Sequence, residues 1–180
     1  SRLSLCAAAI GALALAAFAI APSRAAEEAV IIPAPTVDAR DADGITASTV
    51  PAGVMRLTLD GGAGDDVILG SQAADSLIGG DGNDFVDGNQ GNDTVLLGAG
   101  DDEFQWNPGD GSDIVEGEGG TDTMQFNGAS GDEKIDLSAN GNRLRLVRDV
   151  GNVTMDVNGI EKVNIAAGDG ADTLTIGDLS

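Results

Sequence analysis

The sequence contains no histidine and no tyrosine, and its one cysteine, Cys6, lies close to the first residue. Without histidine, the Ser-His-Asp and Cys-His catalytic arrangements and the His-Glu-x-x-His zinc motif are all excluded. Aromatic residues make up 3% of the chain, which is few for a cleft that stacks sugar rings. We therefore expect no enzyme, although the many carboxylates leave a small polysaccharide-acting enzyme with an acid pair as an alternative.

Basic residues are also scarce: the chain has 9 Lys and Arg against 30 Asp and Glu, for a net charge of −21. None of the 9 lies between Arg56 and Lys134, an interval that holds 18 acidic residues. Like charges repel in a compact state, so this interval either stays unfolded or folds around cations. A basic surface for nucleic acid or for an anionic membrane is absent from it, and neither partner is expected.

The first 25 residues have the pattern of a secretory signal peptide. Arg2 is the basic start, residues 5–21 form an apolar run, and Ser23-Arg24-Ala25 ends in the small residues of a cleavage site. Cleavage there removes Cys6 and leaves a chain without a thiol. We expect a secreted protein, extracellular or periplasmic, with no transmembrane span after cleavage of the leader.

Glycine and aspartate recur every nine residues from Gly61. The first five units read GGAGDDVIL, GSQAADSLI, GGDGNDFVD, GNQGNDTVL and LGAGDDEFQ. Numbering the places of each unit one to nine, the sixth is always Asp and the eighth is always apolar. A unit of eleven residues, WNPGDGSDIVE, and the units GEGGTDTMQ and AGDGADTLT continue the pattern, so eight units keep phase. Disordered acidic segments keep no such period.

These units resemble the RTX (repeat-in-toxin) calcium-binding nonapeptide G-G-x-G-x-D-x-U-x, strongly over 61–125 and weakly at 167–175. The resemblance implies an all-β fold: a right-handed parallel β-roll, or β-solenoid, with two units per coil and several bound calcium ions. Glycines at places one, two and four are expected at positive φ, Asp at place six supplies a carboxylate, and place eight points into the core. Place-five side chains are expected to face solvent.

The resemblance also assigns calcium ligands on both sides of the roll, for about three to five ions. Because GSQAAD lacks glycine at places two and four, the site using Asp75 is doubtful. Asn89 takes place two of another unit, where Asn tolerates positive φ. The two extra residues near Trp106 either break the stack or bulge from it. One side is expected to contain Asp66, Asp84, Asp102 and Asp122 with carbonyls of Gly62, Gly64, Gly80, Gly82, Gly98, Gly100 and Gly120; the other contains Asp75, Asp93 and Asp113 with Gly91, Gly109 and Gly111.

The flanks of the repeats have a different character. Residues 26–53 contain several prolines and are expected to be an irregular lead-in, with the first strand at 54–59 and the roll over 54–125. Residues 126–180 are expected to be a β-rich cap with a degenerate repeat, including a hairpin at Asn140-Gly141 and a turn at Asn158-Gly159. This part also holds five basic residues, interpreted as edge protection on a cap or, alternatively, as an anion or partner patch. They are Lys134, Arg143, Arg145, Arg148 and Lys162.

The sequence thus predicts a secreted calcium-binding repeat protein whose β-roll folds on binding extracellular calcium. Calcium would neutralise the loops, so binding free energy becomes folding free energy. A calcium-rigidified adhesion or cell-surface protein is the second hypothesis, and the polysaccharide-acting enzyme is the third. The sequence does not identify a cell-surface or polysaccharide partner.

Overall fold

The computed structural model describes residues 3–4, 36–38, 44–47 and 56–179, and consists almost entirely of β-strands. Most of the predicted signal peptide lies outside the described residues. In the described part of the chain, no helix has the length and apolar character needed to cross a membrane.

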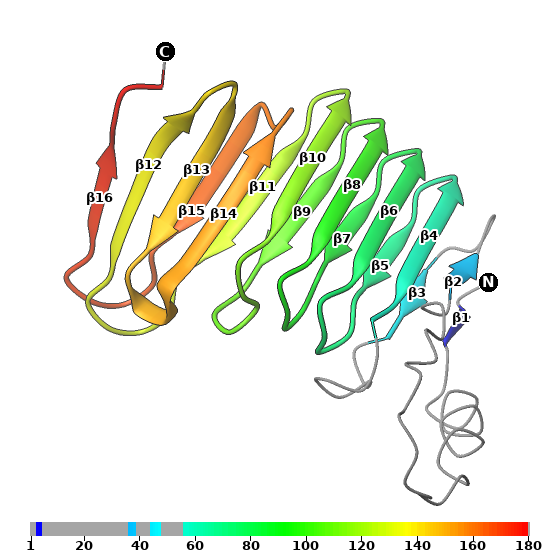
Figure 1. Ribbon diagram of the computed structural model, residues 1–180, viewed down its shortest axis with the longest axis horizontal. Coiled ribbons are helices and arrows are strands. Elements are labelled where there is room, and N and C mark those ends of the chain that lie inside the picture. The colour runs from blue at the N-terminus through cyan, green and yellow to red at the C-terminus, as the bar shows by residue number, and fades with distance from the viewer. Residues whose placement is uncertain (1–2, 5–35, 39–43, 48–55, 180) are drawn as a thin grey trace, which may run out of the picture.

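Each coil of the repeat region contributes one strand to each of two facing sheets (Figure 1). All neighbouring strands in this region pair in parallel, so the predicted parallel β-roll is confirmed. The nine-stranded sheet receives β4 (Thr58–Ala63), β6 (Ser76–Asp81), β8 (Thr94–Ala99) and β10 (Ile114–Gly119); the seven-stranded sheet receives β5 (Val67–Leu69), β7 (Phe85–Asp87), β9 (Glu103–Trp106) and β11 (Thr123–Asn127).

The roll begins earlier in the chain than the sequence suggested. β2 (Thr36–Asp38) pairs in parallel with β4, and β3 (Ile45–Thr46) pairs with β5 and with β1 (Leu3–Ser4). Residues 26–53 therefore include two strands of the sheets, and the expectation of a wholly irregular lead-in is wrong. The strand expected at 54–59 starts at Thr58, and residues 54–55 lie outside the described part.

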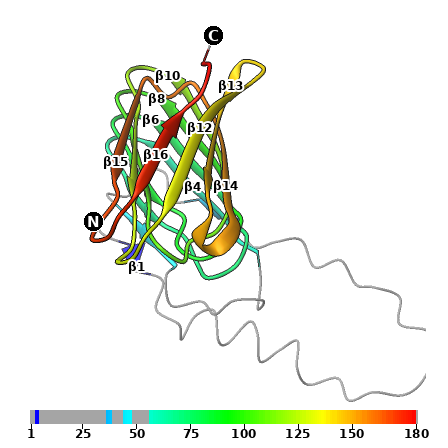
Figure 2. The same cartoon turned by 90° about the vertical axis from the view of Figure 1, so that its left-hand side faces the viewer.

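The C-terminal segment, residues 128–179, interrupts the parallel order. β12 (Lys134–Asn140) and β13 (Arg143–Arg148) form the predicted antiparallel hairpin, with Gly141 at φ 66°. A short 3-10 helix (Val150–Asn152) then leads into β14 (Val153–Asn158), which pairs antiparallel with β13 and parallel with β10. β15 (Lys162–Ala166) extends the seven-stranded sheet beside β11, and β16 (Thr173–Ile176) pairs with β12. Viewed from this end, β12 and β16 lie across the end of the roll (Figure 2).

Two rows of place-eight side chains, one from each sheet, form most of the core that lies within the repeats. In the seven-stranded sheet the row runs Ile68, Val86, Phe104 and Met124; in the nine-stranded sheet it runs Leu77, Val95 and Val115. Every one of these side chains is 0% exposed. Burying such a side chain stabilises the fold by about 1.5–3 kcal/mol, so the nine-residue period places a core contact in every half-coil.

Leu174 departs from this pattern, because it occupies place eight of the last unit but is 51% exposed. It lies on β16, the edge strand of the nine-stranded sheet. The seven-stranded sheet ends at β15 and offers no strand facing it. Place eight is therefore not buried in this unit, although Leu174 is the parallel partner of buried Ile135 and lies on the same side of the sheet.

The two extra residues near Trp106 neither break the stack nor bulge from it. Trp106 is the last residue of β9, and its side chain is buried in the core. Its ring lies parallel to that of Phe126 from the next coil, with centroids 4.2 Å apart and planes inclined by 6°. Asn127 Nδ2 donates to Asn107 Oδ1 at 2.9 Å, so the residues after the two rings are also in register. The coil is two residues longer here than in the preceding repeats, and the next coil has the same greater length.

Candidate metal centre

The loops that follow strands of the nine-stranded sheet, at the top in Figure 1 and here called the upper loops, carry one row of buried aspartates. Each backbone N–H at place six donates to the Oδ1 atom of the place-six aspartate in the next loop. The N–O distances are 2.8 Å from Asp66 to Asp84, 2.7 Å from Asp84 to Asp102 and 3.0 Å from Asp102 to Asp122. The structure thus stacks these four predicted site residues in the expected order.

The lower loops, which follow strands of the seven-stranded sheet, carry the second row. Asp75 N–H donates to Asp93 Oδ1 at 2.7 Å, and Asp93 N–H donates to Asp113 Oδ1 at 2.8 Å. All three carboxylates are at most 1% exposed. This row continues unbroken across the two-residue insertion.

The second carboxylate oxygen of most of these residues has no hydrogen-bond partner among the described residues. Oδ2 of Asp84, Asp93, Asp102, Asp113 and Asp122 is buried and accepts no hydrogen bond from any described residue. Burying an ionised oxygen without a compensating contact is costly. These oxygens are therefore suited to a bound cation.

Glycine at place one accommodates this second oxygen. A Cβ atom on Gly79 would lie 2.5 Å from Asp84 Oδ2, and one on Gly88 would lie 2.4 Å from Asp93 Oδ2. Neither glycine is among those with positive φ, so the expectation that place one needs a left-handed backbone is wrong. The carboxylate and, at Gly79, the Leu97 carbonyl oxygen leave no room for a Cβ atom at these two glycines.

Places two and four lie in the left-handed region in the repeat loops other than that of Asp75. Gly82 has φ 139°, and a Cβ atom there would lie 2.2 Å from the Gly64 carbonyl oxygen of the preceding loop. Asn89 has φ 58° at place two, as predicted. The predicted carbonyl donors with positive φ are Gly62, Gly64, Gly80, Gly82, Gly98, Gly100 and Gly120 in the upper loops and Gly91, Gly109 and Gly111 in the lower loops.

Asp75 differs from the other place-six aspartates, in agreement with the doubt raised by its sequence. Its Oδ2 atom accepts a hydrogen bond from Ser71 N at 2.7 Å, and its Oδ1 atom accepts one from Leu57 N at 2.9 Å. Both oxygens are thus satisfied by backbone N–H groups. Its carboxylate has less need of a cation than that of Asp93 in the next loop.

The electrostatics of the rows favour a positive ligand. Burial raises the pKa of Asp93 to about 8, with further increases from the carboxylates of Asp113, Asp75 and Asp110. Burial likewise raises the pKa of Asp113 to about 7. The pKa values of Asp84, Asp102 and Asp122 are raised by burial and, to a smaller extent, by neighbouring carboxylates. A nearby cation opposes such shifts because it favours the charged form.

The place-five side chains form an exposed ladder, so they do more than face solvent. Asn83 N–H donates to Asp65 Oδ1 at 2.8 Å, and Asp101 N–H donates to Asn83 Oδ1 at 2.8 Å. This ladder runs opposite to that of place six, since here the acceptor lies in the preceding loop. It joins successive loops without using buried carboxylates.

Two glutamates that take part in such loop stacking were missed from the sequence. Glu161 Oε2 accepts from Asp122 N–H at 2.8 Å and continues the upper row. In the C-terminal segment, Asp172 Oδ1 accepts from Glu133 N–H at 3.0 Å. Requiring Asp at place six concealed both glutamates, although GASGDEKID keeps the glycine spacing of the repeat.

The donors gathered here are carboxylate and carbonyl oxygens, which suit a hard cation such as calcium. Among the residues that the structure describes, no group of three or more Asp, Glu, His or Cys side chains could hold a metal by itself. Backbone carbonyls would therefore have to complete the six to eight ligands that calcium takes. The stacked glycine loops supply such carbonyls, so the residues present fit calcium.

The fold and its loops define a parallel β-roll with rows of buried place-six aspartates. A family model for the RTX calcium-binding nonapeptide repeat, in four copies, matches residues 58–72, 69–104 and 109–124. The chain therefore contains RTX repeats, which bind calcium. A search of curated proteins found no match to this chain.

Proposed function

We propose that this chain is a secreted calcium-binding protein whose β-roll folds when calcium binds between successive loops. The observation that carries this proposal is the row of buried Oδ2 atoms that accept no hydrogen bond from any described residue, with raised aspartate pKa values. A cation beside these oxygens offsets both the cost of burying them and their mutual repulsion.

The ligands we assign are the two rows of aspartates together with the glycine carbonyls of places two and four. The upper row gives three pairs of adjacent loops and the lower row two, one of which uses Asp75. Because both oxygens of Asp75 already accept backbone hydrogen bonds, the pair of Asp75 and Asp93 is expected to bind most weakly. The carboxylates supply negative charge, and the carbonyls fill the remaining coordination positions.

The hollow at the C-terminal end gives little support to a catalytic role. This hollow, of about 620 Å³, is lined mainly by apolar side chains, with Glu161 as its one acid. Hydrolysis of a glycosidic bond by the common mechanisms uses two carboxyl groups facing the same bond. This hollow does not supply such a pair.

Two neighbouring aspartates of one loop allow a matched test of the ligand assignment. Asp102→Asn keeps an Oδ1 acceptor for Asp84 N–H but removes the buried charge, whereas Asp101→Asn makes the same change at an exposed place-five residue. We expect the Asp102 variant to bind fewer calcium ions, or to bind them at least about tenfold more weakly, since each ion relies on few carboxylates. Isothermal titration calorimetry measures both quantities.

The Asp101 variant is expected to bind calcium as the unaltered protein does. Equal calcium binding by the Asp102 variant and the unaltered protein would contradict the assignment of place six as a ligand.

A further inference from the structure

A loop outside the stretch matched to RTX repeats has the geometry of a repeat loop. In residues 128–133, Gly128 stands at place one, Gly131 at place four with φ 129°, and Glu133 at place six. A Cβ atom on Gly128 would lie 2.5 Å from Glu133 Oε2, the same separation as between Gly79 and Asp84 Oδ2. The Glu133 carboxylate therefore occupies the position that a repeat aspartate occupies in its own loop.

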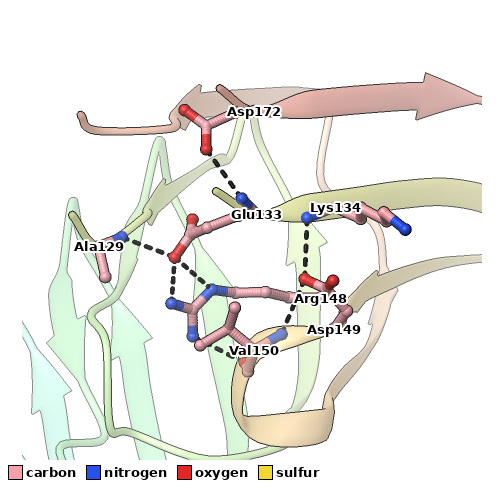
Figure 3. Close-up of polar contacts among 7 residues, drawn as sticks. All are labelled: Ala129, Glu133, Lys134, Arg148, Asp149, Val150 and Asp172. Carbon is pink, nitrogen blue, oxygen red and sulfur yellow. Dashed lines mark hydrogen bonds and ion pairs between the residues drawn. The ribbon is translucent and has the colours of Figure 1, made fainter. Parts of the chain in front are cut away.

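The neighbours of Glu133 differ from those of the repeat aspartates. Arg148 Nε lies 3.1 Å from Glu133 Oε1, and Arg148 Nη2 donates to the same oxygen (Figure 3). Ala129 N–H also donates to Oε1, at 3.0 Å. The side chains of Arg148 and Glu133 are 4% and 1% exposed. Through Oε1 this carboxylate already faces a buried positive charge that belongs to the chain, whereas its Oε2 atom is buried and accepts no hydrogen bond from any described residue.

Arg148 is itself held in place from two further directions. Its guanidinium carbon lies 5.4 Å from the centroid of the Trp106 ring, a cation–π contact, and its Nη1 atom donates to Val150 O at 2.9 Å. Arginine stays charged at any ordinary pH, and its planar group is suited to a buried carboxylate. The positive charge is therefore fixed both in position and in ionisation state.

The strand order explains why a side chain is found here. β13 and β14 separate β12 from β10, so loop 128–133 is separated from the lower loop of Asp113 along the nine-stranded sheet. It stacks instead on residues 167–172, where Gly131 N–H donates to Asp169 O at 2.6 Å. In the repeat rows, Oδ1 accepts an N–H from the preceding loop, whereas at Glu133 the guanidinium group provides the donors.

We propose that Arg148 is a built-in cation that neutralises the place-six carboxylate of loop 128–133 where the repeat loops use calcium, so that the C-terminal segment stays folded without calcium. This inference rests on the proposed calcium-dependent folding of the repeats. Arg143 then links the segment to the last repeat strand of the nine-stranded sheet, through contacts of 2.5 Å to Glu116 on β10 and 2.6 Å to Asp156 on β14. The C-terminal segment accordingly offers a preformed end on which calcium-loaded coils stack.

Hydrogen–deuterium exchange of the full chain, read by segment with mass spectrometry, tests this proposal. In chelator we expect slow exchange over 134–158 and fast exchange over 58–104, and calcium should slow the exchange of 58–104. Arg148→Met keeps an apolar stem beside Trp106 but removes the charge. It should accelerate the exchange of 134–158 in chelator by about tenfold or more, because it leaves a buried carboxylate without its counter-charge.

Two further variants separate charge from packing. Arg145→Met makes the same change at an exposed position of β13 and should leave the exchange of 134–158 unaltered. The double variant Arg148→Met/Glu133→Gln removes both charges and should restore slow exchange in chelator, even if the single variant does not fold. Without such restoration, Arg148 acts by packing and the proposal is wrong.

Fast exchange of 134–158 in the unaltered protein in chelator would also overturn the proposal, as would an Arg148→Met variant that exchanges like the unaltered protein. Failure of the proposed function gives a different result, namely slow exchange over 58–104 in chelator with no response to calcium. In that case, the comparison of the Arg148 and Arg145 variants still decides the role of Arg148.

Discussion

At the scale of single residues, the place-one glycine lies close to the place-six aspartate of its own loop in several repeat loops. The absence of a Cβ atom at Gly79 lets the Asp84 carboxylate lie directly against the backbone. This contact leaves the second carboxylate oxygen buried close to the glycine backbone. Glycine at place one therefore serves the aspartate, whereas the glycines at places two and four serve the turn.

A substitution at place one tests this division of roles. Gly79→Ala would place a Cβ atom 2.2 Å from Leu97 O and 2.5 Å from Asp84 Oδ2, so backbone and carboxylate must both shift. We expect a loss of about 1–3 kcal/mol of unfolding free energy in saturating calcium, the usual cost of overpacking. Urea denaturation followed by circular dichroism measures this loss.

Gly119→Ala is the matched control, because the nearest atom to the added Cβ is 3.9 Å away and the φ angle is not in the left-handed region. A Gly79 variant as stable as the Gly119 variant would show that place one tolerates a side chain.

Most of the candidate site could be predicted at this scale because the repeat encodes it directly. The period identified every aspartate of both rows, and the missing glycines marked Asp75 as different before its two hydrogen bonds were seen. Glu133 and Glu161 were not predicted because the rule was stated for aspartate. Glutamate reaches the same position with one more methylene group, and the spacing of GASGDEKID would have revealed Glu133 had the rule allowed glutamate.

At the scale of elements, the stacked loops act as a unit, since each place-six carboxylate is buried against the next. The coil accepts two extra residues because they add one inward ring and one outward amide per coil, as Trp106-Asn107 and Phe126-Asn127 do. Strand pairing is preserved throughout. Loop stacking, and not coil length, is thus the constant feature of the roll.

The raised pKa values predict an unusual pH dependence in the absence of calcium. Asp93 and Asp113 have folded-state pKa values of about 8 and about 7, well above the roughly 3.9 of an unfolded aspartate. Between about pH 4 and pH 8 the folded state therefore binds more protons than the unfolded state, and its stability falls as the pH rises. In chelator, the far-UV β signal of the repeat region should therefore be larger at pH 5 than at pH 8.

In saturating calcium, the same carboxylates are expected to bind the ion, and protons compete with it. The calcium affinity should then decrease as the pH falls from 8 to 5. A β signal in chelator that increases from pH 5 to pH 8 would contradict the burial of ionisable aspartates in the folded repeat region.

The C-terminal strand order could not be predicted from the pattern. The hairpin at Asn140-Gly141 is a local signal and was predicted. Its position in the sheet was not, because it depends on pairing between strands far apart in the sequence, such as β10 with β14 and β12 with β16. Likewise, β2 and β3 are too short to show a period of their own. They join the sheets because the first coil offers them a parallel edge.

At the scale of the whole molecule, charge is distributed unevenly along the roll. The 18 acidic residues between Arg56 and Lys134 have no basic residue among them, whereas five basic residues lie in the C-terminal segment. Two of those five, Arg143 and Arg148, are engaged in ion pairs within the protein. This favours a structural role for these two over the alternative of an anion or partner patch.

A compact state of the repeat region requires its carboxylate charge to be neutralised. Metal ions do so when they bind the native state only, and they then shift the folding equilibrium by mass action. Because the loops provide oxygen donors with carbonyls among them, calcium is favoured over magnesium, which demands near-ideal octahedral geometry and retains its water.

The most direct test of this account is a calcium titration of the full chain, starting in chelator and followed by far-UV circular dichroism, with magnesium titrated in parallel. The account predicts a cooperative increase in β signal with calcium, from a chelated state in which the C-terminal segment supplies the residual β structure, and little response to magnesium. A chelated protein with the full β signal and no change on adding calcium would contradict it.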